Sequence, residues 1–116
     1  MKEQSIFILP LNQVFTYKIG QNQSDHFNMI DSSGQNDVWF HANGESSCHV
    51  ICSVPPEIKK EELRYLIKQG ALLCKQNTNK LKSQKNVEII YAKIKDVTKT
   101  NIAGTVNVVN SKMIKI

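Results

Sequence analysis

The sequence has no long apolar segment and no biased composition. The apolar run from Ile6 to Leu9 is interrupted by Pro10 and is far shorter than the roughly 20 residues that a transmembrane helix needs. No small-residue cleavage site follows it, so we expect neither a signal peptide nor a membrane anchor. Internal repeats, low-complexity tracts and coiled-coil heptads are also missing. With 116 residues, 41% of them hydrophobic and 22% charged, the chain is expected to form a single domain over residues 1–116.

Cysteine is scarce, and its spacing excludes a disulfide framework. The three cysteines are an odd number, and Cys48 and Cys52 lie about 13 Å apart on a predicted strand at about 3.3 Å per residue. That separation is too large for a disulfide bond. Reduced thiols are typical of cytosolic or nuclear proteins, so we expect a cytoplasmic location.

Acidic residues are too few to balance the lysines, and the excess of positive charge is distributed unevenly along the chain. Up to Pro56 there are two lysines against five acids, a net charge of −3, whereas the chain from Glu57 onward has twelve lysines and Arg64 against five acids, a net of +8. This asymmetry favours a surface that faces a polyanion such as nucleic acid. The alternative is a basic face that is simply solvated.

Hydrophobic periodicity predicts an α+β fold. From Ile58 to about Gln76, apolar residues recur every three to four positions, as in an amphipathic helix. Apolar and polar residues alternate elsewhere, between polar loops near residues 20–26, 31–36, 80–86 and 96–104. We therefore expect a mainly antiparallel sheet with one long amphipathic helix packed on it. The expected strands are Ser5–Leu9, Val14–Ile19, a short Phe27–Ile30, Asp37–His41, Cys48–Cys52, Val87–Ile94, and a closing hairpin of Thr105–Val109 with Lys112–Ile116.

The hairpin of Asp37–His41 with Cys48–Cys52 has one unusual face. If Ala42 lies opposite Cys48, one face is apolar, and the other carries Trp39 with His41 directly across from His49. Aromatic and imidazole rings stack on unpaired bases in single-stranded recognition. The structural alternative is that Trp39 packs beneath the helix and the histidines hold the hairpin together.

Asp37 on the same face is expected to orient a histidine or to cap the preceding loop through its backbone N–H groups. Asp25 is likewise expected to be a structural or orienting carboxylate. A metal site is not expected, because in this register the cysteines face away from the histidines. Hydrolysis is not expected either, because no second carboxylate is placed to hold Mg²⁺. The loop after Gly20 lacks the Gly-Lys-Ser/Thr sequence of a phosphate-binding loop. We expect a protein that is not an enzyme and has no cofactor.

Lysines between the end of the helix and Gly104 are the best candidates for phosphate contacts. Such contacts give salt-sensitive binding without reading sequence. The candidates are Lys80, Lys82, Lys85, Lys93, Lys95 and Lys99.

From about Tyr17 onward, the order of these motifs resembles the NFACT-R domain. This is the C-terminal module of the NFACT proteins that act on stalled large ribosomal subunits, and it also begins some shorter eukaryotic coiled-coil proteins. The matching segments are Gly20-x-Asn22 leading to Asp25, Asp37-Val38-Trp39-Phe40-His41, Ser47-Cys48-His49-Val50, Val87 to Tyr91, Val97-Thr98-Lys99 and Gly104-Thr105-Val106.

The resemblance has departures and implications. The family usually has Asn before its Asp, where this chain has Ser24 before Asp25, and its Gly-Ser-His is Ser47-Cys48-His49 here. The large N-terminal module and the long coiled coil of full NFACT proteins are not in this sequence, so their recruitment of tRNA is not implied as a whole.

The resemblance implies binding of RNA, such as tRNA or rRNA, with a link to translation or ribosome-associated quality control. DNA binding through the same surface, and docking on a ribosome-associated protein, stay open as alternatives.

Overall fold

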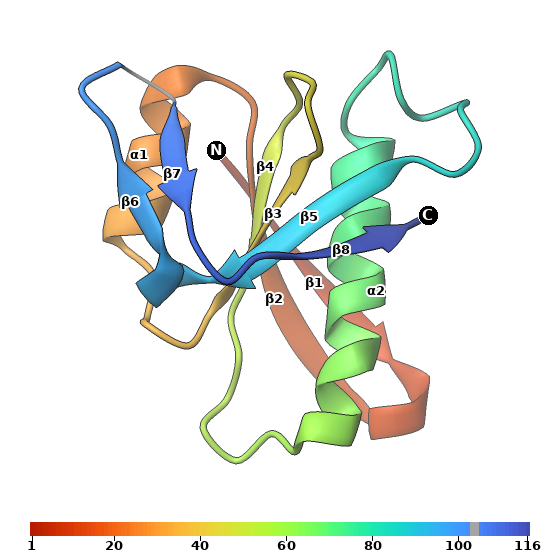
Figure 1. Cartoon of the computed structure of the whole chain (residues 1–116). Coiled ribbons are helices and arrows are strands. Elements are labelled where there is room, and N and C mark those ends of the chain that lie inside the picture. Colours follow the sequence, from red (N-terminus) through yellow and green to blue (C-terminus); the bar gives the residue numbers. More distant parts are fainter. Residues whose placement is uncertain (103–104) are drawn as a thin grey trace.

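The structure is a computed structural model that describes residues 1–102 and 105–116 (Figure 1). In chain order its elements are β1 (Lys2–Ile8), the 3-10 helix η1 (Leu9–Leu11), β2 (Gln13–Gly20), α1 (Gln23–Asp31), β3 (Val38–Ala42), β4 (His49–Cys52), α2 (Lys60–Gln76), β5 (Glu88–Lys93), the 3-10 helix η2 (Ile94–Asp96), β6 (Val97–Lys99), β7 (Val106–Val108) and β8 (Lys112–Lys115).

Six of the strands form one antiparallel sheet in the order β1-β2-β4-β3-β5-β8, while β6 and β7 form a separate ribbon. Helix α2 packs on one face of the sheet, and α1 with the β6–β7 ribbon lies on the other (Figure 1). The expected α+β fold with a long helix on an antiparallel sheet is therefore confirmed, with a second helix added. No helix in the described ranges has both the length and the apolar character to cross a membrane.

The hairpin register follows from the alternation of its side chains. Phe40 pairs with Val50 and Trp39 with Ile51, which is the register that places Ala42 opposite Cys48. On the α2 face, Phe40 and Val50 join the main core. On the α1 face, Trp39 and Ile51 join a second, smaller core with Met29. Both faces of these central strands are therefore covered, and this is why every residue of β4 is buried.

Two sequence predictions were wrong. Residues Phe27–Ile30 are not a strand but part of α1, which begins within the segment expected to be a polar loop. The side chain of Asn22 accepts a hydrogen bond from the backbone N–H of Asp25 at 2.9 Å, and this N-cap starts the helix. Four residues of alternating character are too few to distinguish a strand from a helix.

The second wrong prediction is the closing hairpin of Thr105–Val109 with Lys112–Ile116. β7 pairs with β6, and β8 pairs with β5 instead. Asn110 lies between them with a left-handed φ of 53°, and the chain leaves the ribbon there to add an edge strand to the main sheet. The residues expected to be a loop at 96–104 include the last residue of η2 and all of β6, while Gly104 of the matched Gly104-Thr105-Val106 segment lies outside the described residues.

Candidate nucleic-acid interface

The first half of α2 presents a stripe in which basic and apolar residues alternate. Lys60, Leu63, Arg64 and Ile67 are spaced i, i+3, i+4 and i+7, so they share one face of the helix. The helix begins at Lys60, where the side chain of Glu62 accepts a hydrogen bond from the backbone N–H of Lys59 at 2.9 Å, which is one half of a capping box. Leu63 and Ile67 are half-buried against the main core, whereas Lys60 and Arg64 are exposed.

Strand pairing brings matching residues to the same face of the sheet. Tyr91 and Lys93 are two positions apart on β5, so both side chains point to one face. Lys93 pairs with Val38 of β3, and Tyr91 pairs with Lys112 of β8. Residues directly opposite in an antiparallel pair share a face. Because Val38 belongs to the core under α2, all four side chains lie on that face.

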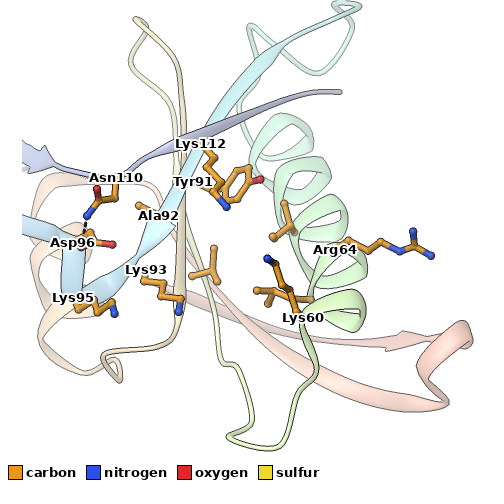
Figure 2. A pocket seen from close by; sticks show the side chains of 12 residues that line it. Lys60, Arg64, Tyr91, Ala92, Lys93, Lys95, Asp96, Asn110 and Lys112 are labelled. Atoms are coloured by element: carbon orange, nitrogen blue, oxygen red, sulfur yellow. Dashed lines mark hydrogen bonds between the residues drawn. The ribbon is translucent and has the colours of Figure 1, made fainter.

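These two groups enclose a pocket of about 420 Å³ between α2 and β5 (Figure 2). Lys60 reaches from α2 toward the strands, and Tyr91 reaches from β5 toward α2. Arg64 extends away from the pocket, and its Nη2 donates to the hydroxyl of Tyr65 at 3.0 Å. We call this site the basic pocket; its charged lining is Lys60, Arg64, Lys93, Lys95, Lys112 and Asp96.

Most of the positive charge of the basic pocket has no carboxylate partner among the described residues. In the described part of the chain, the ion pairs are the Met1 amino group with Asp25 and Lys99 with Asp31. Neither involves a residue of the pocket. Asp96 is the one acid in its lining, and its Oδ1 accepts a hydrogen bond from Asn110 Nδ2 at 3.4 Å. Five cations around one concave site produce a field that attracts anions.

The predicted stacking face lies on the opposite side of the sheet and is largely covered. Trp39 is 1% exposed and His49 is 2% exposed. The indole Nε1 of Trp39 donates to His49 Nδ1 at 3.3 Å, so the His49 nitrogen that it meets is unprotonated. His26 of α1 stacks on His49 with ring centroids 3.4 Å apart. Sequence reasoning missed His26, because it placed this residue in a loop rather than on a helix over the sheet.

His41 is the more accessible histidine of the pair. It is half-buried, its ring lies parallel to Trp39 at 5.7 Å, and its Nδ1–H donates to the carbonyl oxygen of Ala42 at 2.7 Å. Together with Trp39 and His49 it lines a second pocket of about 440 Å³ beside β7. Burial lowers the pKa of His41 and lowers the pKa of His49 to about 2. Neutral imidazoles can stack on a base but do not attract phosphate.

The predicted lysines divide between separate places. Lys93 and Lys95 line the basic pocket. Lys80 donates to Ser46 Oγ at 3.1 Å at the end of the β3–β4 hairpin, and Lys82 and Lys85 are exposed in the segment after α2. Lys99 forms an ion pair with Asp31 at 2.6 Å, so part of its charge is already compensated.

Both predicted orienting carboxylates hold backbone or terminal groups. Asp37 Oδ2 accepts from the N–H of Gly34 and Oδ1 from the N–H of Val54, each at 2.9 Å, so Asp37 joins two loops. Asp25 Oδ2 lies 2.8 Å from the amino group of Met1. Within the described ranges, no three His, Cys, Asp or Glu side chains are grouped so that they could hold a metal ion.

Sequence reasoning missed four residues of the basic pocket: Lys60, Arg64, Tyr91 and Lys112. For the two on α2 a signal was present, since they share the periodicity of Leu63 and Ile67. For Lys112 there was none, because its position depends on the pairing of β8 with β5, which the expected closing hairpin excluded.

Comparisons with known proteins agree with this architecture. The C-terminal part of the fibronectin/fibrinogen-binding protein from Streptococcus suis superposes with a TM-score of 0.73 at 17% sequence identity. The match covers 88% of this chain and 40% of that one, so this chain spans less than half of the solved chain's length, and the likeness shows the fold alone. A comparison with curated protein sequences finds no match. A family model described as NFACT protein RNA binding domain matches residues 7–111, nearly the whole sequence, and the chain belongs to that family.

Proposed function

We propose that this domain binds RNA through the basic pocket between α2 and β5. The observation that carries the proposal is the set of five cations around one open site, none of them paired with a carboxylate among the described residues. The description of the family as an RNA binding domain supports the same function. The covered Trp39 and His49 then support the fold, and His41 is at most a secondary contact.

The expected ligand is structured RNA such as tRNA or rRNA. Lysine contacts phosphates as a point charge and does not read base sequence, so recognition depends on shape and on local charge. Following the family resemblance, we place the domain in the cytoplasm, in translation or ribosome-associated quality control. Its role there is binding without catalysis, and a ribosome-associated protein is a further candidate partner.

Fluorescence anisotropy of labelled tRNA over a range of salt concentrations tests this function. The observed binding constant should fall log-linearly with salt, with a slope of roughly −0.7 to −0.9 per phosphate contacted. The Lys93→Glu/Lys95→Glu variant should lose binding by at least about tenfold, since two contacts become repulsive. Absence of binding to tRNA, single-stranded RNA and duplex DNA at low salt would refute the proposal.

The Lys82→Glu/Lys85→Glu variant is the charge-matched comparison. It changes the net charge by the same amount but lies in the segment after α2, outside the basic pocket. We expect a smaller loss, because these charges act on the bound RNA from a distance and are screened. An equal or greater loss would move the interface to that segment.

DNA is the alternative ligand for the same surface, because phosphate contacts do not distinguish the two nucleic acids. Discrimination would need contacts to the 2′-hydroxyl. Equal affinity for RNA and DNA of the same form would favour a general nucleic-acid-binding domain. Binding to a ribosome-associated protein that is insensitive to salt would instead favour a protein-interaction module.

A further inference from the structure

The basic pocket has a size that suits a single small ligand unit. At about 420 Å³ it lies near the lower end of the roughly 300–1,000 Å³ of small-molecule sites. A nucleotide fits such a volume, whereas a base-paired helix can only lie across its mouth. A site built for duplex backbones alone would need no hollow between the helix and the strands.

The polarity of the pocket changes from its floor to its rim. Val38 is buried and Leu63 and Ile67 are half-buried, and they form an apolar floor. Tyr91 adds a half-buried ring that packs against Phe40, with centroids 6.2 Å apart. The ammonium groups sit on exposed side chains around this floor. An apolar, aromatic floor with a cationic rim suits a base with its attached phosphate better than phosphate alone.

One end of the pocket carries a carboxylate, which accepts hydrogen bonds, beside a side-chain amide, which donates one to it. Asp96 and Asn110 both line the pocket and are joined by a hydrogen bond (Figure 2). A carboxylate repels phosphate, so its presence in the lining works against a site for a bare anion. Carboxylate oxygens accept from the amino groups of bases, and an amide offers both a donor and an acceptor to a base edge.

We propose that the basic pocket holds one unpaired nucleotide of a bound RNA. The base packs on Tyr91 and the apolar floor, its edge meets Asp96 and Asn110, and the flanking phosphates contact Lys60, Lys93 and Lys112. The proposal rests on the RNA binding proposed above and adds to it a preference for RNA with an unpaired base.

The test compares three labelled RNAs of nearly equal charge: a blunt duplex, the same duplex with a one-nucleotide bulge, and that bulge with an abasic nucleotide. The bulged RNA should bind roughly tenfold more tightly than the duplex, which is the scale of one base stacking on an aromatic ring. The abasic bulge keeps the phosphate and the distortion, and it should bind like the duplex.

Tyr91→Leu and Tyr65→Leu form a matched pair of variants, because both tyrosines are half-buried and only Tyr91 lines the pocket. Tyr91→Leu should remove most of the preference for the bulge, and Tyr65→Leu should retain it. If Tyr91→Leu fails to fold, competition on the wild-type protein replaces it: adenosine monophosphate should displace the bulged RNA at lower concentration than ribose 5-phosphate or inorganic phosphate.

The outcomes separate the two proposals. Equal, salt-sensitive binding of all three RNAs would leave the RNA-binding function intact and overturn the single-nucleotide site. Binding of none of them would overturn both. A preference for the bulge that survives in the abasic RNA would assign recognition to backbone shape and also overturn the single-nucleotide site.

Discussion

The two faces of the sheet differ in what their polar side chains do. Under α1, Trp39, His26 and His49 are buried, and His49 contacts both of the others. Under α2, the core opens between the helix and β5 into a pocket whose lysines are exposed. Residue types that are usually associated with chemistry stabilise the first face, while ordinary lysines give the second its binding potential. The proposed site therefore rests on exposure and uncompensated charge rather than on chemical type alone.

Of the substitutions that test this contrast, Trp39→Ala should have the largest effect, and that effect is on stability. Removing a buried aromatic side chain costs about 3–5 kcal/mol of the free energy of unfolding, and here it also removes the hydrogen bond to His49. Urea unfolding followed by circular dichroism measures the loss. Because the basic pocket lies on the other face, the RNA affinity of the folded protein should be unchanged.

Trp39→Phe serves as the milder control, since it retains an aromatic ring and should fold even if the alanine variant does not. A phenylalanine variant with normal stability but with RNA binding reduced more than tenfold would contradict the view that this face only stabilises the fold. It would identify the indole as a base-stacking group in spite of its burial.

Gly70→Ala tests the packing of the α2 face and should have the next largest effect. In an exposed helix this substitution stabilises by up to about 1 kcal/mol. Here a Cβ at Gly70 would overlap the ring of Phe40, so we expect a loss of about 1–3 kcal/mol from overpacking. Differential scanning calorimetry should show a lower melting temperature.

Gly34→Ala is the matched control, because its Cβ would meet Asp37 only at ordinary contact distances of 3.6 Å and beyond. We expect its stability to lie within about 0.5 kcal/mol of wild type. A stabilised Gly70→Ala protein would mean that the ring of Phe40 moves aside and that the core under α2 is loosely packed.

The buried histidines should make stability fall at moderately acidic pH. Burial lowers the pKa of His49 from the usual 6.5 to about 2, so below pH 6.5 the unfolded chain binds a proton that the native protein does not. The free energy of unfolding should then decrease on acidification from about pH 6.5 toward pH 2, by up to about 1.4 kcal/mol per pH unit for each such group. The lowered pKa of His41 acts in the same direction.

Urea titrations between pH 7.5 and 4.5 measure this slope above the range in which most carboxylates titrate. His49→Gln should give a flatter profile, at the cost of lower stability at pH 7.5 from the altered contact with Trp39. A wild-type profile without slope over this range would show that the imidazoles are protonated without cost in the native protein.

Much of the sheet could be predicted because its central hairpin is covered on both faces. The alternation of Phe40 and Val50 with Trp39 and Ile51 fixed the register, since a slip by one residue would exchange the two cores. Burial of Trp39 stayed one of two alternatives, however, because the elements around it on the second face are α1 and the β6–β7 ribbon rather than the long helix. Helix α1 depends on the N-cap at Asn22 and has too few apolar residues to be recognised by periodicity.

The basic pocket was only half predictable for a similar reason. Lys93 and Lys95 stood out by their charge, whereas Lys60 was not predicted, although its place on the amphipathic helix was a usable signal. The enclosure of the pocket also needs Lys112, which the chain brings beside Tyr91 from outside any local pattern. Alternation along a strand indicates which of its faces is buried, but it does not indicate which other strand it pairs with.

Lys60→Ala and Arg64→Ala should have the smallest effects, and the difference between their RNA affinities tests which side of α2 faces the RNA. Both residues are exposed and one helical turn apart, but Lys60 reaches toward the strands while Arg64 extends away and bonds Tyr65 (Figure 2). Lys60→Ala should therefore reduce the salt slope of RNA binding by roughly 0.7–0.9, the loss of one phosphate contact. Arg64→Ala should reduce it less, since its guanidinium already has a partner in Tyr65. Arg64→Ala and Lys60→Ala are compared by anisotropy titrations at four or more salt concentrations, which resolve such a difference.

If Arg64→Ala has the larger effect, the RNA instead lies along the outer side of α2. The charges on that side, rather than the enclosed pocket, then determine binding.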